Sequence, residues 1–256
     1  MTVPQEKAVS FGDVQTTGAL IYETIMAMGC GKVFYIDGWD GFGASAVLRY
    51  MASVLPARRI HPELSFDRTI FIDCSKWKNR RAVQRAVARE LKLDRSVMAI
   101  LDHNDEWDDF YGVDESSRGE IDSVARVINQ TLSATKFMMF FLNGSYNEID
   151  VGTIGIPLTR FGESMVIWTF DRSCLAMHHH NHRKITAKLR YTHVFMHSMR
   201  KISDLESSDF RELLHQQAAA IVARGLGMQD IDPTIVAECC LYGLFLQYVM
   251  GLAIAH

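Results

Sequence analysis

The chain has 256 residues, of which 48% are hydrophobic and 22% are charged, and its formal net charge is −3. This is the composition of an ordinary globular protein, long enough for one large domain or two small ones. The acidic balance argues against nucleic-acid binding, and five scattered cysteines without a secretory signal favour a reduced, cytoplasmic protein.

Apolar runs alternate with helical patterns over the first 200 residues. Buried strands are expected at 32–37, 68–74, 136–143, 164–170 and 191–196, and helices at 45–55, 79–91 and 121–132. Continuous apolar strands that alternate with helices predict an α/β fold with a parallel sheet covered by helices on both faces. After about residue 200 the pattern becomes all helical, which predicts a small helical appendage.

Local signals refine these elements. The acidic stretch at 102–115 is expected to be a solvated loop. The pairs Ser117-x-x-Glu120 and Ser203-x-x-Glu206 predict capping boxes, and Asp232 followed by Pro233 predicts the start of a further helix.

A glycine-rich stretch between the first strand and its helix, GWDGFGAS at 38–45, nearly matches a phosphate-binding loop. The pattern is G-x-x-x-x-G-K-[ST], and only the lysine position differs, because Ala44 fills it. In such a P-loop, backbone N–H groups and the helix N-terminus hold phosphate. The candidate nucleotide-binding residues are Gly38, Gly41, Phe42, Gly43, Ala44 and Ser45.

Two catalytic positions of a P-loop enzyme lack their charge here. The lysine that Ala44 replaces normally neutralises the β and γ phosphates. Its loss costs roughly tenfold to a hundredfold in affinity, at ~1.5–3 kcal/mol for a hydrogen bond to a charged group. Asp40 adds a negative charge, and the strand at 136–142 ends in Asn143, whose amide lacks the anionic charge that helps to hold Mg²⁺. Although Ser45 keeps its hydroxyl, we expect neither Mg²⁺ binding nor efficient hydrolysis.

Other stretches form a series with this loop in chain order. They read FDRTIFIDCSKWKNRRAVQRAVARELKL, KFMMFFLNGS, MVIWTFDRS, LESSDFRELLHQQAA and ECCLYGLFLQY. Together with IDGWDGFGASAVLRYMA, they resemble the NB-ARC nucleotide-binding module of plant disease-resistance proteins, the NLR family of STAND P-loop NTPases. The similarity covers roughly residues 30 to 250, and it is greatest to a degenerate NB-ARC subgroup of cereal grasses.

The resemblance implies a P-loop NTPase-like, NB-ARC-like nucleotide-binding domain at 1–200 and a helical ARC-like segment, truncated or not, at 201–256. It also implies a role in plant defence. The partners would be proteins, through self-association or through full-length resistance proteins, with no nucleic acid and no membrane span.

The departures from the family pattern fall on its charged contacts. The lysine is replaced by Ala44, and the acidic pair at the Walker B-like strand end is replaced by Asn143 and Gly144. Asp171 stands where the arginine of T-T-R is expected, and Arg172, the sensor-like residue, follows it. We therefore expect a (pseudo)nucleotide-binding signalling module that binds ADP or ATP weakly or not at all.

Alternative interpretations remain open. An active ATP/ADP-binding NTPase switch could use Arg172 or Lys136 in place of the missing lysine. The apolar stretch at 235–255 has nearly the length of a membrane span, although a buried helix fits it better. The histidines at 177–182 and the basic run at 76–81 are more typical of a solvated loop and of the exposed start of a helix than of a metal or nucleic-acid site.

Overall fold

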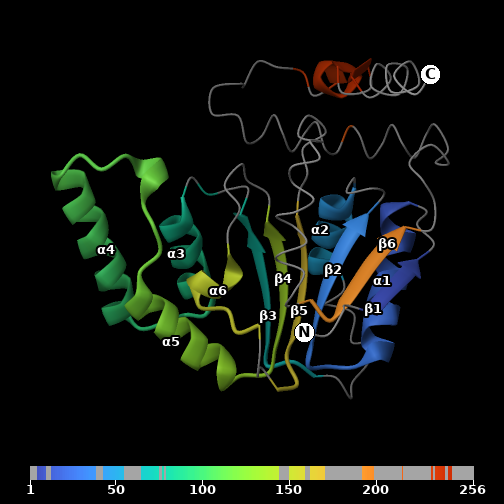
Figure 1. Ribbon diagram of the computed structural model, residues 1–256, viewed down its shortest axis with the longest axis horizontal. Helices are drawn as coiled ribbons and strands as arrows, with labels where there is room; N and C mark the ends of the chain where they lie inside the picture. Colours follow the sequence, from blue (N-terminus) through green and yellow to red (C-terminus); the bar gives the residue numbers. More distant parts are fainter. Residues whose placement is uncertain are drawn as a thin grey trace.

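The computed structural model describes residues 5–9, 13–38, 43–54, 65–74, 77, 79–143, 150–158, 162–170, 192–198, 215, 232, 234–239, 242 and 243 (Figure 1). These residues form a six-stranded, all-parallel sheet with helices on both faces, which confirms the predicted α/β fold.

The strands of the sheet lie in the order β1-β6-β2-β5-β4-β3. Their bounds are β1 Gln5–Val9, β2 Lys32–Gly38, β3 Arg68–Asp73, β4 Phe137–Asn143, β5 Met165–Phe170 and β6 Val194–Ser198. Because all six run in the same direction, their carboxyl ends lie at one edge of the sheet, the upper edge in Figure 1. The central strand β2, which carries the candidate loop at its end, lies between β6 and β5.

The helices divide between the two faces. On one face α1 (Val14–Met28) and α2 (Ala44–Val54) pack against each other and the sheet, whereas α3 (Arg80–Glu90), α5 (Asp122–Ser133) and α6 (Val151–Ile154) cover the other face. Helix α4 (Arg95–Phe110) lies outside α3 and α5, at the left of Figure 1.

Alternate residues of each strand supply two apolar cores. On β2, Phe34 and Ile36 join the core under α1 and α2, whereas Val33 and Tyr35 join the core under α3, α5 and α6. Strands that are buried on both faces explain why the apolar runs in the sequence are continuous rather than alternating.

The acidic stretch at 102–115 corrects one prediction, because most of it is helical rather than a loop. Helix α4 extends to Phe110, and only the 3₁₀ turn at Glu115–Ser117 and its neighbours match the expected loop. Ion pairs explain the difference. Three aspartates of α4, Asp102, Asp105 and Asp108, pair with arginines of α3 and are thereby held as part of a helix–helix interface.

The capping box predicted at Ser117 and Glu120 is also wrong. Helix α5 begins at Asp122 after an N-cap residue, Ile121, that makes no side-chain cap hydrogen bond. Ser117 belongs to the 3₁₀ turn, and the Glu120 carboxylate lies 3.1 Å from Arg80 Nε instead.

The C-terminal part is described at few positions. Residues 234–239 and 242–243 are helical, and the Asp232 side chain accepts a 2.8 Å hydrogen bond from the backbone N–H of Thr234, which confirms Asp232 as a helix-starting residue. The domain boundary near 200 and the capping box at 203–206 lie outside the described residues.

Candidate functional site

In the described residues, the candidate loop is preceded by a strand and followed by a helix, as a P-loop requires. β2 ends at Gly38 and α2 begins at Ala44, while residues 39–42 lie outside the described chain. Gly43 has a φ of +72°, in the left-handed region that favours glycine, and its carbonyl accepts the Val47 N–H at 3.1 Å to start the helix. The glycine requirement inferred from the sequence is therefore met at Gly43.

The two residues after this glycine are buried. Ala44 and Ser45 are each 2% exposed, and Ala44 belongs to the apolar core beneath α1 and α2. The methyl group of Ala44 therefore completes the core at the position where a P-loop enzyme has its phosphate-binding cation.

The carboxyl edge of the sheet is where ligands bind in folds of this kind. Helix α2 follows β2 on one face, whereas α6 follows β4 on the opposite face. In open α/β sheets, ligands bind beyond the carboxyl ends of the strands where connections leave to opposite faces. The described strand ends at this edge include Gly38, Asp73 and Asn143, and Asn143 lies in register with Phe170 of β5.

An ion pair that the sequence reasoning missed lies at this edge. Arg49 of α2 reaches Asp73, the last residue of β3, with Nη2 and Nε at 3.0 and 3.2 Å from the same carboxylate oxygen. The Asp73 side chain is 3% exposed, whereas that of Arg49 is 31% exposed. Arg49 follows Ser45 by one helical turn and so lies on the same side of α2.

This ion pair accounts for the carboxylate at the edge. Among the described residues, Asp73 is the only buried aspartate or glutamate. A buried carboxylate needs a partner, because removing an unpaired charge from water costs several kcal/mol. Breaking a buried ion pair costs a similar amount, since it leaves such a charge behind. Asp73 therefore pairs with Arg49, and this ion pair ties α2 to the end of β3.

A hydrogen bond also joins β5 to β2 close to the candidate loop. The Thr169 hydroxyl is fully buried and donates to the carbonyl of Ile36 at 2.6 Å. The pairing of β2 with β6 shifts register between Ile36 and Gly38. These features fix the end of β2 where the loop leaves the sheet.

Lys136, one candidate for the missing cation, lies at the wrong edge. It precedes β4, and its Nζ contacts Glu163 at 2.8 Å before β5, at the amino ends of the strands. A strand of seven residues spans about 23 Å, so Lys136 cannot reach a phosphate at the carboxyl edge. Arg172, the other candidate, lies outside the described residues.

The basic run at 76–81 has structural roles at its described positions. The Asn79 side chain caps α3 by accepting the Ala82 N–H at 2.7 Å. Arg80 lies beside Glu120, and Arg81 pairs with Asp105 and Asp108 at 3.0 and 2.6 Å. This part of the run thus begins a helix, as the sequence pattern favours, but Arg81 is buried rather than exposed because it pairs with the two aspartates.

The remaining candidates concern metal and membrane. The histidine stretch at 177–182 lies outside the described residues, within which no group of three or more His, Cys, Asp or Glu side chains is arranged to hold a metal ion. No helix in the described part of the chain has both the length and the apolar character needed to cross a membrane. Most of the stretch at 235–255 lies beyond that part.

Comparison with known proteins gives no family assignment: no family model matches this sequence, and no curated protein matches it significantly.

Proposed function

We propose that the chain is an NB-ARC-like signalling module of plant defence that keeps the P-loop framework without efficient nucleotide hydrolysis. It binds ADP or ATP weakly or not at all, resides in the cytoplasm, and acts through protein partners, by self-association or through full-length resistance proteins. The role in defence and the partners rest on the resemblance of the motif series.

The distribution of charge at the carboxyl edge carries the proposal. Ala44 places a buried methyl group where the phosphate-binding lysine would stand, and Asn143 ends the strand where a metal-binding carboxylate would stand. The remaining buried carboxylate, Asp73, is held by Arg49. Hydrolysis of a nucleoside triphosphate needs a cation on the transferred phosphate and an anion on the metal, and neither is available from these residues.

Weak binding through the backbone remains compatible with this arrangement. The turn at Gly43 leads into the N-terminus of α2, an 11-residue helix whose first N–H groups provide partial positive charge. These groups need no lysine. We expect any nucleotide affinity to be about tenfold to a hundredfold below that of a P-loop with its lysine.

Restoring the two charges tests the proposal. The purified chain is denatured and the supernatant is assayed for released nucleotide, beside the double variant Ala44→Lys, Asn143→Asp. We expect less than stoichiometric nucleotide from the natural chain and clear recovery from the double variant. Stoichiometric ADP in the natural chain would contradict weak binding, and a folded double variant without nucleotide would contradict the P-loop framework.

Two controls keep the test decisive. Because Ala44 is buried, Ala44→Lys can unfold the chain, so circular dichroism and the single variant Asn143→Asp are measured in parallel. Mg²⁺-dependent phosphate release is then measured for the natural chain and for Ser45→Ala. Release above background that disappears in Ser45→Ala would establish the alternative, an active NTPase switch with rearranged charges.

A further inference from the structure

Large apolar side chains are exposed together along one side of α4. Trp107, Phe110 and Tyr111 are 57%, 81% and 60% exposed, and Ile100 is 37% exposed. With His103, which is also exposed, they follow the spacing i, i+3, i+7, i+10 and i+11, which places them on one side of α4 and its C-cap residue, Tyr111. We call these five residues the α4 aromatic surface.

The rings of the α4 aromatic surface lie against one another. Trp107 and Tyr111 have centroids 5.0 Å apart, and Phe110 meets Tyr111 edge to face at 5.1 Å. His103 lies 6.3 Å from Trp107. Rings that already contact each other lose little freedom on binding, and aromatic anchors of this kind supply much of the energy at interfaces.

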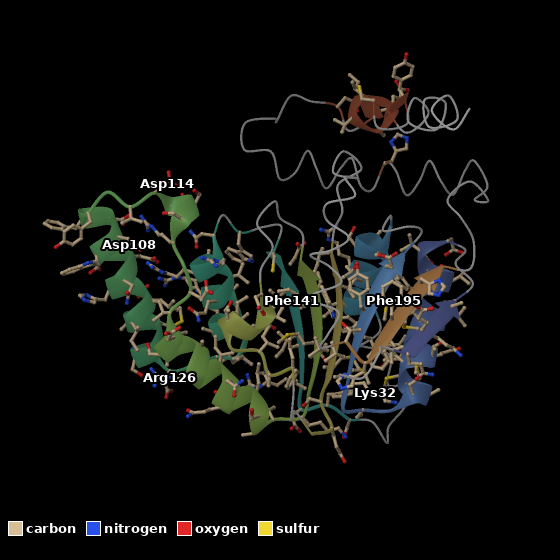
Figure 2. The ribbon with its side chains drawn as sticks, in the orientation of Figure 1. Lys32, Asp108, Asp114, Arg126, Phe141 and Phe195 are labelled. Atoms are coloured by element: carbon tan, nitrogen blue, oxygen red, sulfur yellow. The ribbon has the colours of Figure 1, made fainter. Side chains whose placement is uncertain are left out.

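The rest of α4 explains why these rings stay exposed. Its buried side carries Val97 and Leu101, followed by Asp105 and Asp108, which pair with Arg81. These ion pairs fix the rotation of the helix, so the aromatic face cannot turn toward the core. Figure 2 shows Asp108 on the side of the molecule away from Lys32 of β2 and Phe195 of β6.

The charge around this surface is strongly negative. Residues 96–115 contain seven aspartates and glutamates and no lysine or arginine. Three arginines, Arg81, Arg85 and Arg118, form ion pairs with this segment, so seven negative charges against three positive ones leave four. Glu106, next to Trp107, is among the exposed carboxylates.

We propose that the α4 aromatic surface docks a basic amphipathic helix of a partner protein. Its apolar residues would cover Phe110 and Ile100, and its lysine or arginine side chains would lie over Trp107 and Tyr111 beside the acidic rim. Cations are attracted to the faces of such rings, and opposite charges across an interface favour the encounter. The same negative charge repels nucleic acid and anionic lipid surfaces. The proposal is independent of nucleotide binding.

A displayed library of random peptides of about 16 residues, long enough for four helical turns, tests this chemistry. Binders are selected on the purified chain and counter-selected on the double variant Trp107→Ala, Phe110→Ser. We expect the enriched peptides to carry lysine or arginine together with apolar residues at spacings of three and four. Failure to enrich any sequence, or enrichment of neutral or acidic ones, would overturn the proposal.

A matched pair of tyrosines locates the binding. One enriched peptide is measured by fluorescence anisotropy against Tyr111→Ala and against Tyr242→Ala, whose tyrosines are 60% and 64% exposed. We expect Tyr111→Ala to raise Kd about tenfold, with no change for Tyr242→Ala. Equal effects would overturn the proposal.

A last experiment distinguishes a partner helix from a second copy of this chain as the occupant of the α4 aromatic surface. Light scattering measures the mass of the natural chain and of Trp107→Ala, Phe110→Ser as the protein concentration rises, with circular dichroism to verify folding. We expect both masses to stay equal. A concentration-dependent mass that only the natural chain shows would identify a second copy as the occupant and overturn the basic-helix proposal.

Discussion

The helices on one face of the sheet and the outer helix α4 on the other are held by different means. On the first face, α1 and α2 meet through apolar packing so close that a Cβ on Gly18 would lie 2.6 Å from Tyr50 Cδ1. On the second face, α4 buries Val97 and Leu101 and is otherwise joined to α3 through arginine–aspartate pairs. One face is held by burial, and the outer layer of the other is held by charge.

This difference in packing bears on the two candidate sites, one at the start of α2 and one on α4. Apolar packing from Ala44 to Met51, together with the Arg49–Asp73 ion pair, holds α2 against the sheet and thus fixes the turn at Gly43. Charge pairing needs only one side of α4, and it leaves the remaining surface to solvent. The candidate nucleotide site and the candidate docking surface therefore lie on elements that are stabilised in separate ways.

Among the substitutions that test this contrast, the largest loss of stability is expected where α6 meets α5 on the second face. Gly155 has a φ of +107°, and a Cβ there would lie 2.2 Å from the carbonyl oxygen of Ala125. Backbone cannot move aside as a flexible side chain can, so Gly155→Ala should lower the free energy of unfolding by about 3 kcal/mol or more. Urea unfolding measures it.

Gly112 supplies the control for this substitution. It also has a positive φ, +67°, but a Cβ there would have no atom within 4 Å. Gly112→Ala should therefore cost only the strain of the left-handed backbone, about 1 kcal/mol. Equal effects at the two glycines would mean that α6 shifts readily and does not anchor the second face.

The next largest loss of stability is expected from breaking the ion pairs that hold α4. Arg81 is 8% exposed, pairs with Asp105 and Asp108, and donates from Nε to the carbonyl of Gly119 at 3.1 Å. Arg81→Met keeps most of the side chain and removes its charge. Breaking a buried pair costs ~3–5 kcal/mol, and the partial exposure of the two aspartates reduces our expectation to about 2 kcal/mol.

The control for Arg81→Met is the same substitution at an exposed arginine on the neighbouring helix. Arg126 of α5, labelled in Figure 2, is exposed, and its Nε donates to the carbonyl of Asp122 at 3.4 Å. Arg126→Met should change the free energy of unfolding by less than about 0.5 kcal/mol. If Arg81→Met is equally mild in urea unfolding, α4 is held by its apolar residues and the contrast between the faces fails.

Most of the sheet follows from the sequence because its strands are buried on both sides. The runs at 32–37, 68–74, 136–143 and 164–170 each correspond to a strand within two residues at either end. β1 and α1 were not expected. β1 is an edge strand whose first four residues are exposed, so it lacks the apolar signal.

Long-range charge pairs are what the sequence does not reveal. In the candidate site, Gly43 and Ser45 were predicted from the local pattern, but Arg49 and Asp73 lie 24 residues apart and meet only in the fold. The same separation joins Arg81 to Asp105, which is why an acidic stretch that suggested a solvated loop is a helix. A charged residue that ends an apolar strand, as Asp73 does, is the signal that was available.

A smaller difference in stability is expected between substitutions at the N-caps of α1 and α4, which lie on opposite faces. The Asp13 carboxylate accepts the N–H groups of Gln15 and Thr16 at 2.8 Å, whereas Asp94 makes no side-chain cap hydrogen bond. Asp13→Ala should cost about 1 kcal/mol in thermal or urea unfolding. Asp94→Ala should cost a few tenths at most, roughly the value of an exposed charge near a helix start.

The pH dependence of this cap has a definite sign. The Thr16 hydroxyl, and then its N–H, lower the pKa of Asp13 below 3.8. The stabilisation by Asp13 is therefore present above the unfolded pKa and is lost as the pH falls through the lower folded pKa. The difference between the natural chain and Asp13→Ala should narrow below about pH 4. A constant difference would contradict the role of the charge.

The smallest loss of stability is expected at His193, which precedes β6 and bonds to the amino end of β2, at the edge of the sheet opposite the candidate loop. His193 Nδ1 accepts the N–H of Val33 at 3.0 Å, and burial followed by the charge of Lys32 lowers its pKa below 6.5. A lowered folded pKa means that the stabilisation is present above the unfolded pKa and is lost as the pH falls. Because much of the side chain is exposed, we expect a loss of about 0.5 kcal/mol between pH 7.5 and 5.5.

His193→Asn, which keeps an acceptor that does not titrate, should remove this part of the pH dependence in urea unfolding, whereas His103→Asn on exposed α4 should not. If both variants keep the natural slope, the strands are joined by backbone bonds alone.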